Sequence, residues 1–269
     1  MIRRLILPLA LALGAAAPGF TKPAAEPVAP MTAAEESGVQ LALDRAQLLH
    51  AYDQAAWHTT DTLVGDLPEA ALATIRGWVV TPEGADFRVT YYSGDPGTEH
   101  RPVYSAVWTG GSTVRDRRTH ESGDLLSAEE ARLAAASDAV PEEGPMRCAN
   151  RRFNRVVLPR ADADGADLVY LLTPQTEAAS IPLGGHHRAE VKDGKLLAQR
   201  PFSNSCVDMP VAGETAAFVV THLLDPTPTE VHFFSVFAAK KPIYVITTMN
   251  DRTWVGEISE GRARVRLIR

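Results

Sequence analysis

The stretch FVVTHLLDPTPTEVHFFSVFAAKKPIYVITTMNDRTWVGE, residues 218–257, decides the predicted fold of this 269-residue chain. It opens with an apolar run, Phe218–Val220, and contains a second one, Pro242–Thr247. Between them, Thr227-Pro228-Thr229-Glu230 is typical of a helix start, because the first threonine and the glutamate can each bond the other's amide and proline suits the first turn. We therefore predict a strand, a helix that ends near Ala239 and a second strand.

The predicted helix has a wide apolar surface. Val231, Phe234 and Ala238 lie on one face, and Phe233 and Phe237 lie on the adjacent one. We expect this helix to be largely buried. A strand is the alternative for the same run, since it is rich in aromatic and β-branched residues.

Upstream of this unit, two helices flank a run of strands. Residues 32–60 place apolar side chains at helical spacing, and Ser127-Ala128-Glu129-Glu130 begins a second helix that ends near Ala139. Glycine- and proline-rich turns separate the apolar runs between the helices, as in an antiparallel meander. These runs are Trp78–Val80, Phe87–Tyr92 and Val103–Trp108.

A Pro/Gly/Glu segment, Pro141–Pro145, marks the predicted internal boundary. Beyond it we expect strands at Val156–Leu158, Leu168–Leu172, Trp254–Ile258 and Ala263–Ile268, and a hairpin turning at Asp193-Gly194. The expected fold class is α+β. Residues 32–140 form an N-terminal helix plus an antiparallel meander, and residues 146–269 form a mixed sheet with one buried helix.

The N-terminus has the pattern of a secretion signal. Arg3 and Arg4 precede the apolar run Leu5–Leu13 and a small-residue cleavage region. We predict a signal peptide over residues 1–25, a Pro/Ala-rich tether over residues 26–31, and a periplasmic or secreted protein. The apolar run is too short to cross a membrane, and we expect no membrane span elsewhere.

The mature chain is predicted to be acidic. Cleavage after residue 25 removes three of the 27 basic residues and no acidic one, which leaves 24 basic residues against 33 acidic ones, a net charge of −9. This charge argues against nucleic acid or an anionic membrane as the partner. We expect the partner to be a protein or an envelope component.

Two cysteines occur, Cys148 and Cys206. In an oxidising compartment an isolated pair usually forms a disulfide, and two separate buried thiols are the alternative. A bridge here would stabilise the fold by about 4 kcal/mol in the chain-entropy model.

Three short motifs share a layout with a known family. They are Val220-Thr221-His222-Leu223, Thr229-Glu230-Val231-His232 and the strand Pro242–Thr247. Together they resemble the JAB/MPN metallopeptidases, in which a strand bearing His-x-His-Pro is followed by Ser-x-x-Asp at a helix start and by a strand of similar sequence. The resemblance covers about thirty residues. Val220 stands in place of the family's first histidine, Leu223 in place of its proline, and His232 in place of its aspartate ligand.

The resemblance implies a metal site at His222 and His232. A catalytic zinc usually has three protein ligands, and His186, His187 or Glu190 could supply the third. Alternatively, His222 bonds a backbone carbonyl and His232 is a neutral, packed side chain. We favour this structural reading, since two imidazoles without a carboxylate base make a poor hydrolase.

Two further clusters could line a binding site. Gly184-Gly185 precedes a hairpin arm, where glycines suggest close backbone approach or a sharp turn. Trp57-His58-Thr59-Thr60-Asp61 ends the first predicted helix. It could line a pocket, but we expect the tryptophan to pack and a threonine to cap the next element.

The sequence therefore predicts an exported non-catalytic protein that binds another protein or an envelope component, without a cofactor. The alternative is a zinc-dependent hydrolase of peptide or isopeptide bonds, with zinc-bound water as the nucleophile. No catalytic residue is assigned.

Overall fold

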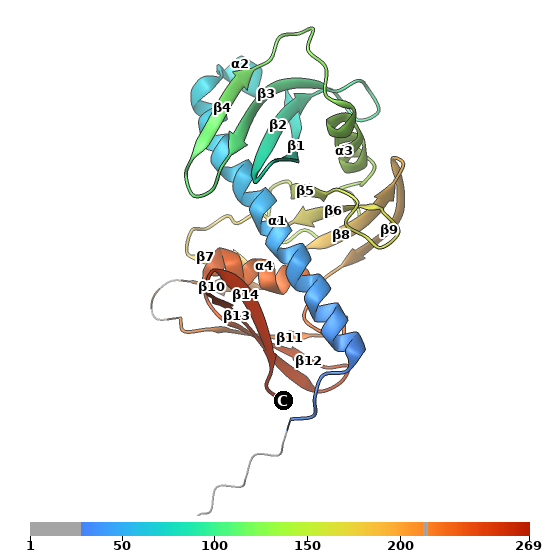
Figure 1. The fold of residues 1–269 in the computed structure, drawn as a ribbon, viewed down its shortest axis with the longest axis vertical. Helices are drawn as coiled ribbons and strands as arrows, with labels where there is room; N and C mark the ends of the chain where they lie inside the picture. Colours follow the sequence, from blue (N-terminus) through green and yellow to red (C-terminus); the bar gives the residue numbers. More distant parts are fainter. Residues whose placement is uncertain (1–27, 212, 214) are drawn as a thin grey trace, which may run out of the picture.

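The computed structural model describes residues 28–211, 213 and 215–269 as an α+β fold built along one long helix. Figure 1 shows this helix, α1 (Ala33–Asp66), running along the molecule past three successive groups of strands. The predicted signal peptide and the first two residues of the tether lie outside the described residues. The last residues of the tether are held, because the Arg252 guanidinium donates to the carbonyls of Ala29 and Pro30.

Helix α1 begins where the sequence predicts and ends later. Thr32 and Glu35 form a reciprocal capping box at its start. The hydroxyls of Thr59 and Thr60 donate to the carbonyls of Ala55 and Ala56 and thus lie within the helix. The expectation that one of these threonines caps the next element is therefore wrong.

The meander occupies one end of α1. Its four strands pair antiparallel in chain order: β1 (Ile75–Glu83), β2 (Asp86–Ser93), β3 (Arg101–Trp108) and β4 (Val114–Thr119). The short helix α2 (Glu69–Leu72) joins α1 to the sheet. Helix α3 (Ala128–Asp138) follows, and its predicted capping box, Ser127 with Glu130, is confirmed.

A second antiparallel sheet lies at the middle of α1, in the order β5-β6-β8-β9. Its strands are β5 (Asn154–Leu158), β6 (Asp167–Leu172), β8 (His187–Lys192) and β9 (Lys195–Pro201). The predicted hairpin joins the last two strands. Asp193 and Gly194 both have positive φ, as a tight hairpin turn with the right twist requires.

The third sheet contains the strand–helix–strand unit. Its order is β11 (Phe218–His222), β12 (Ile243–Thr247), β13 (Arg252–Ser259) and β14 (Arg262–Leu267). Strands β11 and β12 are parallel and the others antiparallel, so the sheet is mixed, as predicted. Helix α4 (Glu230–Ala239) connects the parallel pair and is largely buried, which excludes the alternative strand.

The cap of α4 is Thr229, and the prediction of Thr227 is wrong by two residues. The Thr229 amide donates to Nδ1 of His232, 3.0 Å away. The glutamate expected to complete the cap, Glu230, is buried and bonds Arg188 and Tyr170 instead. Its carboxylate therefore does not reach back to Thr227.

The predicted disulfide joins Cys148 to Cys206. It lies beside a small two-stranded sheet, β7 (Ser180–Pro182) with β10 (Asp208–Pro210), which the sequence did not predict. The predicted close approach at Gly184 and Gly185 is confirmed. A Cβ on Gly184 would lie 2.3 Å from the Ser205 carbonyl oxygen, and one on Gly185 would lie 2.5 Å from the Cys148 sulfur.

The largest buried core crosses the boundary predicted at residues 141–145. It combines Leu49 and Tyr52 of α1 with residues of the meander, of β5 and β6, and Val231 of α4. Helix α1 thus supplies apolar side chains to both predicted regions. Within the part of the chain that the structure describes, no helix is both long and apolar enough to cross a membrane.

Candidate functional site

The two histidines of the strand–helix–strand unit lie together. His222 ends β11, His232 lies in the first turn of α4, and their ring centroids are 4.8 Å apart. Each has another partner. Nε2 of His222 lies 2.9 Å from a carboxylate oxygen of Asp225, whereas Nδ1 of His232 accepts from the Thr229 amide. Asp225 also accepts from both Nη groups of Arg200, so Arg200, Asp225 and His222 form a hydrogen-bonded series that does not include His232.

Burial decides the charge of His232. Burial, and to a smaller extent the nearby His222, lowers the pKa of this imidazole to about 3. Burial alone would raise the pKa of Asp225, but Arg200 and His222 hold it well below its usual range. The side chain of His232 is thus a neutral acceptor that caps its own helix, which matches the packed reading of this residue.

The residues considered as a third ligand do not complete a zinc site. Both ring nitrogens of His186 are used, since Nδ1 accepts from the Thr173 amide and Nε2 lies 3.0 Å from the Pro182 carbonyl. His187 bonds the Met146 carbonyl and Glu190 pairs with Arg188. No group of three His, Cys, Asp or Glu residues among those described could hold a metal ion. The donor set around His222 therefore does not fit a catalytic zinc.

A cleft of about 630 Å³ lies where α1 passes α4, β1 and the end of β6. One face of α1 contributes His50, Asp53, Gln54, Trp57 and Thr60, of which His50, Asp53, Trp57 and Thr60 follow one another at three or four residues. The other elements contribute both apolar and polar side chains to its lining: Trp78, Leu172, Ile181, Phe234 and Phe237, with Asn154, Thr173, Gln175 and Lys240. A concave, largely apolar space with a few polar groups is the usual form of a ligand site.

Two polar groups in this cleft lack a matching partner. Burial raises the pKa of Asp53 to about 6, which the Gln54 side chain partly opposes. Among the described residues, no Lys, Arg or His forms an ion pair with Asp53. Nδ1 of His50 is buried and has no hydrogen-bond partner there. Burial and the Lys240 ammonium lower the pKa of His50 to about 4, so it is neutral at pH 7.

The exposure of Trp57 differs from the sequence-based expectation. We expected it to pack, but 56% of this residue is exposed, and it lines the cleft. His58 contacts it, with ring centroids 4.6 Å apart, and is itself stacked on Trp108. The indole therefore has a ring contact with His58 and leaves most of its surface exposed. The sequence contained the signal, an aromatic–polar cluster on α1, but the partners across the cleft come from distant segments.

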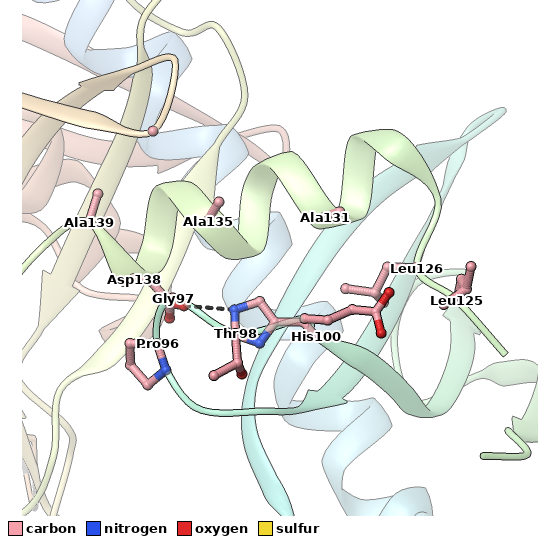
Figure 2. A pocket seen from close by; sticks show the side chains of 12 residues that line it. Pro96, Gly97, Thr98, His100, Leu125, Leu126, Ala131, Ala135, Asp138 and Ala139 are labelled. Atoms are coloured by element: carbon pink, nitrogen blue, oxygen red, sulfur yellow. Dashed lines mark hydrogen bonds and ion pairs between the residues drawn. The ribbon is translucent and has the colours of Figure 1, made fainter. Parts of the chain in front are cut away.

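Figure 2 shows a second hollow, of about 560 Å³, between α3 and the loop before β3. His100 and Asp138 both line it and contact each other, with Nε2 of His100 2.7 Å from the carboxylate. Ala131 and Ala135 of α3 and Ala139, which caps its C-terminus, line it. Because its charged groups pair with each other, this hollow offers a ligand less than the cleft at Asp53 does.

Comparisons with known proteins add little. No protein-family model matches the chain. No curated protein matches it. Four solved chains match; one is described as a glycoside hydrolase and is 8% identical. That match covers 73% of this chain and 60% of the other, with a TM-score of 0.16. The chain thus spans 60% of that structure's length, and a likeness this low carries no argument about fold or activity.

Proposed function

We propose that this protein is an exported, non-catalytic binding protein whose ligand is another protein or an envelope component. The observation that carries the proposal is the cleft between α1 and α4, with an exposed tryptophan and an unpaired carboxylate facing its space. Such groups cost stability unless a ligand or water satisfies them. Their presence in one concave site supports binding.

Two features support export. The N-terminal sequence has the pattern of a secretion signal. The disulfide between Cys148 and Cys206 is typical of oxidising compartments. Fractionation of cells that make the full chain tests this part: mature protein outside the cytoplasm is the expected result, and full-length protein in the cytoplasm would contradict it.

The unit β11–α4–β12 keeps the layout that suggested a JAB/MPN-like domain, and we retain that resemblance as a proposal for this unit alone. The hydrolase alternative has no supporting observation, since His222 and His232 are engaged by Asp225 and Thr229.

Binding at the cleft is tested with a matched pair of variants. Trp57 and Val64 are both exposed apolar residues of α1, but only Trp57 lines the cleft. Immobilised mature protein is exposed to an envelope extract, and the retained component is identified by mass spectrometry. We expect Trp57→Ala to lose this component and Val64→Ala to keep it. Equal retention by both variants would contradict the cleft as the binding site.

A further inference from the structure

We propose that the cleft recognises a cation, an alkylammonium or guanidinium group, with Asp53 as its counter-ion and Trp57 and Trp78 as its aromatic walls. This inference rests on the proposed function and names the chemistry of its ligand. The group is borne either by a small free amine or by a basic side chain of a protein.

The carboxylate of Asp53 provides the first argument. It lines the cleft, half-buried, and forms no ion pair with any residue that the structure describes. A carboxylate withdrawn from water is stabilised when an opposite charge donates to it. A cationic ligand would supply what the protein itself does not.

The walls of the cleft provide the second argument. The face of an aromatic ring carries negative charge density and attracts a cation, with tryptophan the strongest. Trp57 is one helical turn from Asp53 on the same face of α1, and Trp78 lines the cleft from β1. His58 contacts Trp57 and is itself stacked on Trp108, so less conformational entropy is lost when a ligand covers the indole.

Lys240 is the other charged residue that lines the cleft, and it forms no ion pair with Asp53. His50 lies one turn before Asp53, and the charge that acts on it is that of Lys240, an exposed residue just after α4. The seven residues from His50 to Trp57 span about 10 Å of helix. His50 is neutral above about pH 4, so it does not repel a cation between pH 5 and 8. The acidic mature chain further favours a cationic ligand.

The test is calorimetric titration of the mature protein with three probes. These are n-butylammonium, its neutral counterpart 1-butanol, and the blocked peptide Ac-Gly-Gly-Lys-Gly-Gly-amide. We expect both cations to bind. The affinity of the alcohol should be lower by about tenfold or more, which is the usual contribution of a hydrogen bond to a charged group. Tighter binding of the peptide identifies a protein segment as the source, and tighter binding of the amine identifies a small free amine.

Two Asp→Asn substitutions test whether the Asp53 carboxylate binds the cation. Asp53→Asn keeps the shape and should lose about tenfold in affinity for both cations, whereas Asp61→Asn removes the same charge from an exposed site on α1 outside the cleft and should change nothing. Trp57→Ala, at an exposed position, should also weaken binding. Affinity should fall as the pH drops below about 6, because protonation of Asp53 removes the counter-ion.

Equal binding of butanol and butylammonium, or equal effects of the two Asp→Asn changes, would overturn the inference. The proposed function fails separately. If Trp57→Ala abolishes retention of the envelope component while neither cation binds, the cleft is a binding site for another chemistry. If the cations bind at Asp53 but Trp57→Ala does not change how much of the envelope component is retained, the cleft binds amines and the partner binds elsewhere.

Discussion

Asp53 is a carboxylic acid whose pKa is shifted by burial and that forms no ion pair with any described residue. Burial raises its pKa from an ordinary value of 3.8 to about 6. The folded protein therefore binds this proton more tightly than the unfolded chain does. Between about pH 4 and 6 its contribution to the free energy of unfolding grows as the pH falls, and above pH 6 the ionised carboxylate destabilises the fold.

Asp53→Asn should therefore raise the free energy of unfolding at pH 7 and 8. The gain over the natural chain should shrink as the pH drops below 6, because the natural carboxyl is then protonated as well. Urea unfolding of both proteins from pH 4.5 to 8 measures this difference. A difference that does not vary with pH would show that the Asp53 carboxyl has an ordinary pKa.

Thr229 provides a second test at this scale. Thr229→Ala removes the side chain that caps α4 and contacts His232, and should cost about 1 kcal/mol of stability, the usual loss for a capping hydroxyl. Thr227→Ala, two residues earlier, should cost less than half of that. Thermal unfolding of the two variants measures both losses of stability. A larger loss for Thr227→Ala would show that Thr227 is the cap, as the sequence pattern predicted.

Among the elements, the connection between β7 and β8 is the most tightly packed. Its two glycines touch the disulfide loop, and a Cβ on Gly184 would lie 2.3 Å from one backbone atom and 2.5 Å from another. Backbone atoms cannot move aside as the end of a flexible side chain can. The connection therefore depends on the absence of a side chain at Gly184, and at Gly185 also on a positive φ that favours glycine.

Gly184→Ala should destabilise the protein, by about 1–3 kcal/mol in the usual range for overpacking. Gly65→Ala is the matched control. Gly65 lies in α1 with nothing within 4 Å of its Cβ position, so the same change should stabilise the helix by up to about 1 kcal/mol. Melting temperatures that shift in the same direction for both variants would contradict the close approach.

Local patterns predicted most elements and few of their contacts. Capping boxes at Thr32 and Ser127 and the Asp-Gly turn act over three or four residues, so the sequence shows them directly. The cap of α4 was misplaced because Glu230 forms bonds to Arg188 and Tyr170, which lie 42 and 60 residues away. The pattern at Trp57 indicated a possible pocket, but its other lining residues, such as Trp78 and Phe234, come from distant segments and could not be predicted.

At the scale of the whole molecule, α1 holds the three groups of strands together. Phe233 of α4 packs against Ala42 and Ala46 of α1, while Leu49 and Tyr52 belong to the core shared by the meander and β5–β6. The predicted division into residues 32–140 and 146–269 remains a prediction about folding units. Burial of apolar side chains on α1 from both sides argues that the two regions stabilise each other.

A fragment of residues 146–269 should therefore fail to fold alone, because loss of α1 exposes the apolar face of α4. The expected amide proton–nitrogen spectrum is poorly dispersed, whereas that of residues 28–269 is well dispersed. A dispersed spectrum of the fragment, with a cooperative thermal transition, would show that residues 146–269 are an independent domain.

The central claim is that this protein works by binding a partner in the cleft between α1 and α4. Photo-cross-linking in living cells tests it most directly, with benzoylphenylalanine placed at Gln54, which lines the cleft, or at Val64, which is exposed on the same helix outside it. We predict a discrete adduct from position 54 that is absent from position 64 and is lost when Trp57→Ala is added. Equal adducts at both positions, or none at position 54, would contradict the account.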